Sequence, residues 1–300
     1  MNIYIIIPVH NNKQETLNCL GCLAKQTFTN FKTIIVDDGS TDGTSEAIKK
    51  IFPEVEVLTG NGELWWTRAI NLALSKFLPL VHKDDYFLTL NNDVEFDESY
   101  LENLVFAAKQ KPNTLIGSVS LDIHDKTKVV DAGIHINWLN QKRTMGSFKK
   151  GDFFNMEASR LSGRGALIPS KVFKEVGLYD EKHFPQYAAD AELSVRAKNS
   201  GFKLCVYYDA ILLSDRTISG LKHSPLMKVN IKQAYNLLFS IKSVSNIKTR
   251  FNVVRFMCPS KFRLINYLFE SLKILLVLSS IPPFHYIKIG MFNGYKLFKK

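Results

Sequence analysis

Two apolar runs of the chain each end in a group of acidic and amide side chains. The run Phe31–Val36 leads into Asp37-Asp38, and further along the run Tyr86–Leu90 leads into Asn91-Asn92-Asp93. Strands that deliver carboxylates at their carboxyl ends line the ligand crevice of an open α/β sheet. Neither a Gly-x-Gly-x-x-Gly run nor a Walker lysine lies between the two groups. The pattern therefore favours a metal-bound diphosphate over a dinucleotide or a nucleoside triphosphate as the ligand.

Three separated segments of the chain resemble motifs of the family 2 glycosyltransferases. They are Ile5–Asn11, Ile35–Asp42 and Leu90–Asp93, and the resemblance extends over roughly residues 1–220. It implies the GT-A fold and an inverting transfer of a sugar from a UDP- or dTDP-sugar donor. It further implies a glycan or a lipid-linked glycan as acceptor, and Mg²⁺ or Mn²⁺ as the assisting metal.

The resemblance assigns the nucleotide to the ends of the first two predicted strands. Asp38 stands where the family has the acid that reads the base, and its carboxylate would accept a hydrogen bond from the imide N–H of uracil or thymine. Pro8 and His10 stand where the family contacts the nucleotide. A structural alternative is that Asp37 and Asp38 only form a turn that caps the following helix. That alternative leaves Asn91-Asn92-Asp93 unexplained.

Two adjacent tryptophans begin the next predicted helix, in the segment from Asn61 to Arg68. Trp65 and Arg68 are the candidates here, because an aromatic ring stacks on a base or sugar and a cation at a helix start clamps phosphate. The alternative is that one tryptophan is part of the core and the other covers an edge.

Asp93 is the candidate metal ligand, since a hard cation that bridges phosphate oxygens neutralises a departing diphosphate. The family's usual motif is Asp-x-Asp, and this chain has Asn91 in place of the first acid. Asn91 can still hydrogen-bond ribose or sugar, so Asn91 and Asn92 are assigned to the nucleotide. Asp215, shortly after the last predicted strand, is a second candidate ligand from the C-terminal side.

The general base is expected in the segment Ala189–Leu193, which follows Leu178–Phe184. Both stretches resemble the family segment whose central aspartate is the base, and that position is Asp190 here. An inverting transfer needs a base because the acceptor hydroxyl loses its proton as it attacks the anomeric carbon. The chain departs from the family at Ala189, where the family has glutamate. The alternative is that Asp190 only caps its helix.

A glycine-rich stretch precedes this segment and is expected to line the donor and acceptor pocket. Gly163 and Gly165 would let the backbone approach a sugar ring closely. Arg164 and Glu192 complete the predicted pocket, with a surface cation as the alternative for Arg164.

Alternating strand and helix patterns predict an α/β fold with a mostly parallel central sheet and helices on both faces. The expected domain covers 1–220, with a nucleotide-binding half at 1–120 and an acceptor-binding half at 121–220. Strands are expected at Ile3–Val9, Phe31–Val36, Val55–Leu58, Tyr86–Leu90, Leu115–Leu121 and Phe202–Tyr208. Helices are expected at Lys13–Lys25, Ser45–Ile51, Trp65–Phe77, Val172–Val176 and Asp190–Asn199.

Residues 221–300 form a basic region, expected to be an amphipathic helical tail. They carry fourteen Lys and Arg against Glu270 as the single acid, whereas the whole chain has a net charge of +11. The expected helices include Phe262–Leu278 and Ile287–Phe298. Basic amphipathic helices lie in membrane interfaces, so a membrane surface is the expected partner, with a peripheral, cytoplasmic location on the inner face. The alternative is that these helices cover the catalytic domain.

The remaining features narrow the function less sharply. Cys19 and Cys22 are spaced C-x-x-C without a second pair, and the helical pattern around them indicates packing in a reducing compartment. No signal sequence and no spanning segment is expected. A catalytically inactive nucleotide-sugar-binding module, suggested by Ala189 and Asn91, stays open. A second alternative is a protein that binds nucleic acid through the tail. The preferred interpretation is a partner other than nucleic acid.

Overall fold

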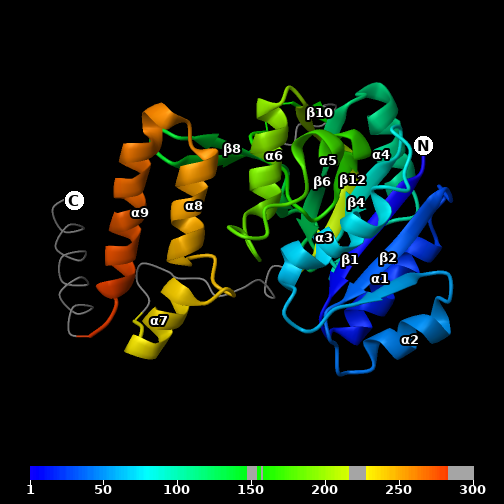
Figure 1. Cartoon of the computed structure of the whole chain (residues 1–300), viewed down its shortest axis with the longest axis horizontal. Helices are drawn as coiled ribbons and strands as arrows, with labels where there is room; N and C mark the ends of the chain where they lie inside the picture. Colours follow the sequence, from blue (N-terminus) through cyan, green and yellow to red (C-terminus); the bar gives the residue numbers. More distant parts are fainter. Residues whose placement is uncertain (147–153, 157, 216–227, 283–300) are drawn as a thin grey trace. The chain divides into compact units, whose positions relative to one another are not determined.

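The structure is a computed structural model, which describes residues 1–146, 154–156, 158–215 and 228–282 (Figure 1). The chain divides into two compact units. One comprises Met1–Asn137 and Lys142–Ile218, and the other comprises Trp138–Gln141 and Ser219–Lys300. The predicted domain boundary near Gly220 and the predicted helix Ile287–Phe298 lie outside the described residues.

Strands and helices alternate through the first unit. Its helices are α1 (Lys13–Ala24), α2 (Thr44–Ile51), α3 (Trp65–Phe77), α4 (Tyr100–Gln110), α5 (Ser170–Val176) and α6 (Ala189–Asn199). Its strands are β1 (Ile3–Val9), β2 (Phe31–Asp37), β3 (Glu56–Thr59), β4 (Tyr86–Thr89), β5 (Val94–Glu95), β6 (Thr114–Asp122), β7 (Val129–Asp131), β8 (Ile134–Asn137), β9 (Lys142–Met145), β10 (Phe154–Asn155), β11 (Ala166–Pro169) and β12 (Lys203–Ser214). The predicted β1 and α3 match the observed elements residue for residue.

One large sheet organises the unit, in the order β10-β12-β6-β11-β4-β1-β2-β3. The pairs β1–β2, β1–β4, β2–β3 and β6–β12 are parallel. Strand β11 runs antiparallel between β4 and β6, so these two neighbours of β11 point the same way. The prediction of a mostly parallel sheet is confirmed. The carboxyl ends of β1, β2, β4, β6 and β12 consequently share one edge, where ligands of such sheets bind.

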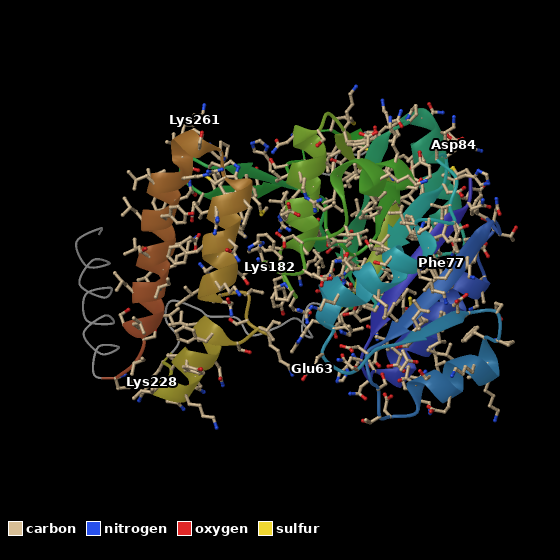
Figure 2. The ribbon with its side chains drawn as sticks, viewed as in Figure 1. Glu63, Phe77, Asp84, Lys182, Lys228 and Lys261 are labelled. Carbon is tan, nitrogen blue, oxygen red and sulfur yellow. The ribbon has the colours of Figure 1, made fainter. Side chains whose placement is uncertain are left out.

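Helices cover both faces of this sheet. Alternate residues of a strand point to opposite faces, so the contacts of β1 show which helices lie on each face. Ile5 and Ile7 of β1 belong to the buried cluster that contains Leu20 of α1 and Ile48 of α2. On the other face, the Tyr4 ring lies 6.1 Å from the ring of Phe77, which ends α3 and is labelled in Figure 2. The expected layer arrangement is therefore confirmed.

Strand β12 is longer than the sequence predicts and runs on past Tyr208 to Ser214. The register against β6 shifts between Tyr207 and Ile211, which marks a bulge, and the strand then resumes pairing through Ser214. The polar Asp209 breaks the apolar pattern at this bulge, which is why the sequence suggests a strand end there. The bulge matters for the site, because the extra length carries Asp215 to the ligand edge of the sheet.

The second unit contains α7 (Ile231–Phe239), α8 (Ile247–Met257), a short 3₁₀ turn (Ser260–Phe262) and α9 (Arg263–Leu278). Helix α9 confirms the predicted helix at 262–278. Its Glu270 is buried and lies 2.7 Å from both the guanidinium of Arg250 and the ammonium of Lys273. Among the described residues, no helix is both long enough and apolar enough to cross a bilayer.

Candidate functional site

A cavity of about 190 Å³ opens at the ligand edge of the sheet in the first unit. Its walls come from four places: the start of α3, the turn after β4, the loop before β11 and the loop leading into α6. The lining residues are Trp66, Asn91, Ser162, Gly163, Arg164, Gln186, Tyr187, Ala188, Ala189 and Asp190. The fold thus brings together Asn91 of the motif after β4, the glycine-rich stretch and the segment around Asp190, which the sequence keeps far apart.

Asp190 lies in the first turn of α6, and two backbone N–H groups fix its carboxylate. Oδ2 accepts a hydrogen bond from the Gly163 N–H at 2.9 Å, and Oδ1 accepts one from the Ala191 N–H at 2.8 Å. The N-cap position belongs to Ala188, in the left-handed conformation, so Asp190 does not occupy the cap. A carboxylate held in this way at a cavity wall is oriented to accept a proton from a bound hydroxyl.

Trp66 connects the motifs around the cavity. Its indole N–H donates to Asn91 Oδ1 at 3.3 Å, and its ring meets the Tyr179 ring edge-on at 5.4 Å between centroids. A Cβ atom at Gly163 would lie 2.6 Å from Trp66 Cζ2, so glycine is required for the two to pack. Trp66 is therefore the tryptophan that lines the cavity, whereas the sequence analysis singled out its neighbour Trp65.

The first turn of α3 has no backbone donor left for a phosphate. The Leu64 and Trp65 N–H groups donate to Asp38 Oδ2, at 2.8 and 3.1 Å. The next two N–H groups donate to the Gln186 side chain and to the Pro185 carbonyl. Arg68 is half exposed and lies 3.6 Å from Glu181. The helix start therefore offers a phosphate no free backbone N–H group, and contact of the Trp65 or Arg68 side chain with the nucleotide stays a prediction.

Asp38 anchors the loop that precedes α3. In addition to the two bonds above, its Oδ1 accepts the Gly62 N–H at 2.7 Å. His10 Nδ1 donates to the Asp38 carbonyl at 2.6 Å, so His10 and the end of β1 at Pro8 border the same turn. Asp37 holds this turn by accepting the Ser40 N–H at 2.9 Å. The pair thus forms the expected turn, but the N-cap of the following helix α2 is Gly43, without a side-chain cap. Base reading by Asp38 stays a prediction.

The residues that follow β4 point in different directions. Asn91 faces the cavity, but the Asn92 amide donates to Thr16 Oγ1 in α1 at 2.9 Å. Asp93 Oδ1 is buried and accepts no hydrogen bond from any described residue. Ser214 pairs with Val94, and continuing this antiparallel register by one step sets Asp215 opposite Asp93. This register agrees with a metal site shared by Asp93 and Asp215, and metal binding by either residue stays a prediction.

These donors fit a divalent cation that takes its other ligands from elsewhere. A buried carboxylate oxygen without a partner costs free energy unless a cation or a donor meets it. The described residues contain no group of three or more His, Cys, Asp or Glu side chains placed to hold a metal by themselves. His124 Nε2 lies 3.4 Å from Asp215 Oδ2. A metal here would therefore be completed by phosphate oxygens and water.

The remaining predicted pocket residues separate into lining and support. Arg164 lines the cavity and donates through Nη1 to Ser214 Oγ at 2.9 Å. Gly165 has φ +82° and packs directly on Ser118 and Leu212, so it shapes the turn. Glu192 is almost fully buried and forms a bidentate pair with Arg196 at 2.8 and 2.9 Å. Glu192 does not line the cavity, and its role is to brace α6.

Sequence reasoning missed several residues around this cavity. Gln186 and Tyr187 line it from the loop before α6, and the only signal for them was their closeness to Asp190 in sequence. Asp131, at the end of β7, is half-buried, and burial raises its pKa. The charge of Arg160 opposes this rise, and Asp190 and Arg164 are weaker charged neighbours. Nothing in the pattern around Asp131 indicated that it lies beside the site.

Comparison with known proteins gives a consistent result. The family described as "Glycosyl transferase family 2" matches residues 4–177. An N-acetylglucosaminyl-diphospho-decaprenol L-rhamnosyltransferase of Mycobacterium tuberculosis is 26% identical over 208 residues, 63% of this chain and 67% of that protein. The glycosyltransferase GlyG of Streptococcus pneumoniae is 28% identical over 188 residues, 61% of this chain and 59% of that protein.

Solved structures share the fold at low sequence identity. The mannosyltransferase PcManGT from Pyrobaculum calidifontis, in complex with GDP-Man and Mn²⁺, superimposes with a TM-score of 0.57 at 14% identity. The match covers 93% of this chain and 73% of PcManGT. The sheet described above is thus a GT-A sheet.

Proposed function

The chain belongs to glycosyl transferase family 2, and from this premise we propose an inverting, metal-assisted transfer of a sugar from a UDP- or dTDP-sugar to a glycan or lipid-linked glycan. One observation carries the proposal: Asp190 lines the same cavity as Trp66 and Asn91. The rhamnosyltransferase relative makes a deoxyhexose one donor sugar to test, with a lipid-linked diphosphate glycan as acceptor.

The proposed chemistry assigns a separate task to each wall. Asp190 takes the proton of the acceptor hydroxyl as its oxygen forms the new bond to the anomeric carbon. The bond from that carbon to the nucleoside diphosphate breaks in the same step, and the configuration inverts. The N–H groups of Gly163 and Ala191 keep the base in one orientation throughout. Mg²⁺ or Mn²⁺ held by Asp93 and Asp215 would neutralise the departing diphosphate.

The first prediction concerns this metal. With Mn²⁺ present, UDP or dTDP is expected to raise the melting temperature of the wild-type chain, and EDTA is expected to reduce that shift. Asp93→Ala is expected to bind the nucleotide as the wild type does in EDTA, because only the cation-dependent term is lost. Thermal-shift titrations with UDP, dTDP, their sugars and free uridine measure this.

Two outcomes would contradict it. If no nucleoside diphosphate shifts the wild-type melting temperature, the proposed donor class is wrong. If Asp93→Ala keeps the full Mn²⁺ dependence, the metal assignment is wrong while the donor class stands. Retained donor binding without any turnover or hydrolysis would instead support the inactive binding module, the alternative that Ala189 and Asn91 suggest.

For the second unit, we propose attachment to an anionic, cytoplasmic membrane surface. Helix α9 exposes Leu264 by 76%, Leu268 by 63% and Leu272 by 53%, spaced four residues apart. Helix α7 exposes Ile231 by 75% and Phe239 by 55% along one face. Exposed apolar faces beside clustered cations are what an interfacial helix offers to a bilayer.

The second prediction tests this attachment with the full chain. It is expected to pellet with anionic vesicles at low salt and to remain soluble with neutral vesicles. Each basic group near an anionic leaflet contributes ~1 kcal/mol, so four of them would favour binding roughly a thousandfold. High salt should reverse it. The double variant Leu264→Glu/Leu268→Glu should bind more weakly, whereas Leu80→Glu, at an exposed position of the first unit, should not.

Sedimentation that is equal for both vesicle types, or unchanged by the α9 variant, would refute the attachment. The second unit would then be assigned to packing or to acceptor binding.

A further inference from the structure

Arg164 is a cation without an anionic partner in a cavity that also contains the proposed base. No described acidic side chain lies within ion-pair distance of its guanidinium. Its Nε is buried and donates to no described residue. A buried guanidinium N–H without an acceptor destabilises the fold, and an added acceptor would remove this cost in free energy. A ligand anion would supply the missing acceptor.

The structure holds this guanidinium in one place. Nη1 donates to Ser214 Oγ at 2.9 Å, and Ser214 Oγ in turn lies 2.8 Å from Ser120 Oγ. The backbone next to Arg164 is also fixed, because the Gly165 N–H donates to the Thr89 carbonyl at 2.8 Å. A side chain anchored to two strand ends loses little further freedom when a ligand binds.

The anchor ties Arg164 to the strand ends that carry the two candidate metal ligands in the sequence. Ser214 immediately precedes Asp215 and pairs with Val94, which follows Asp93. The planar fork of arginine matches phosphate oxygens in a bidentate manner. A diphosphate bound at this end of the sheet would therefore have both a guanidinium and candidate metal-binding carboxylates to neutralise it.

We infer that Arg164 binds the diphosphate of the ligand and shares the neutralisation of its charge with the metal. The inference rests on the proposed function. It also accounts for Asn91, whose side-chain oxygen accepts the Trp66 indole N–H and carries no charge with which to ligate a cation. A metal site with one acid fewer is expected to hold its cation more weakly. The guanidinium of Arg164 then supplies part of the positive charge that the diphosphate needs.

Diphosphate chemistry has two possible sources here, the donor nucleotide and a lipid-linked acceptor. The position of Ser214 beside Asp215 favours the donor. The experiment therefore measures calorimetric affinities of the full chain for UDP, dTDP, uridine, inorganic pyrophosphate and farnesyl diphosphate, each with Mn²⁺ and with EDTA.

For the wild type, UDP or dTDP is expected to bind more tightly than its nucleoside even in EDTA. Arg164→Ala should lose at least about tenfold in affinity for the nucleoside diphosphate and for pyrophosphate in EDTA, with uridine unchanged. Arg164→Lys keeps the positive charge but lacks the planar guanidinium, so its affinity should lie between those of the wild type and Arg164→Ala. Lys182→Ala, an exposed cation of the loop before α6 labelled in Figure 2, is the control and should match the wild type.

Each result bears on the inference. If Arg164→Ala loses affinity for farnesyl diphosphate alone, the donor assignment is overturned. If it also loses affinity for uridine, Arg164 has a structural role. Unchanged UDP and dTDP affinity in a folded Arg164→Ala or Arg164→Gln variant would overturn the inference. If the wild type binds no nucleoside diphosphate under either condition, the proposed function fails instead.

Discussion

Replacing Asp190 by asparagine is expected to lower turnover by at least about a hundredfold while the chain still binds its nucleotide sugar. Asparagine has nearly the same shape and can still accept the N–H of Gly163 or of Ala191, so the loop and α6 should keep their places. The amide, however, cannot take the proton of the acceptor hydroxyl. The variant therefore loses the base and little else.

The measurement is initial-rate kinetics with the donor identified by thermal shift, together with a donor titration of the variant. Asp125→Asn is the matched control. Asp125 is paired with Lys128 at 2.8 Å and lies outside the cavity wall, so its variant should turn over normally. Turnover of Asp190→Asn within a few-fold of wild type would remove Asp190 from the role of base.

Substituting Gly163 by alanine is expected to cost at least about tenfold in activity, because the new methyl group has no room. It would lie 2.6 Å from Trp66 Cζ2 and 2.8 Å from Cη2. Trp66 is held by Asn91, Tyr179 and Gln186 and has little freedom to retreat. Overpacking of this kind costs about 1–3 kcal/mol, and here the strain falls on the wall that orients Asp190.

A double-mutant cycle makes this prediction specific. Phenylalanine in place of Trp66 lacks the two clashing atoms, so Gly163→Ala/Trp66→Phe should be more active than Gly163→Ala alone. Gly21→Ala in α1 is the control, since nothing lies within 4 Å of the added carbon. It should be neutral or stabilise the helix by about 0.5–1 kcal/mol. Additive losses in the cycle would show that the contact between Gly163 and Trp66 does not control the site.

The local elements and the fold class could be predicted from the sequence. Strand β1 and helix α3 were predicted to the residue, because a short apolar run and a long amphipathic pattern have different periods. The motif around Asp190 also identified a cavity residue without any structure. These features are local: each depends on residues that are neighbours in the chain.

The tertiary structure decided which of the motif residues meet. Trp66 and not Trp65 lines the cavity, because the left-handed Trp65 at the start of α3 turns consecutive side chains to different sides. The Asn92 side chain bonds to Thr16, and Glu192 pairs with Arg196, although both Asn92 and Glu192 lie inside recognisable motifs. A motif gives the order of residues in the sequence, but the local backbone decides which way each side chain points.

The pairing of distant strand ends was also beyond the sequence. The register of β12 against β5 places Asp215 near Asp93 in the sheet only because a bulge near Asp209 lets β12 continue that far. Arg164 is tied to the same strand end through Ser214. Such contacts depend on the register between strands far apart in the chain, and no local pattern encodes that register. The sequence by itself determined the fold, the family motifs and the base candidate. The tertiary structure alone decided how the cavity wall, the carboxylate pair and the guanidinium come together.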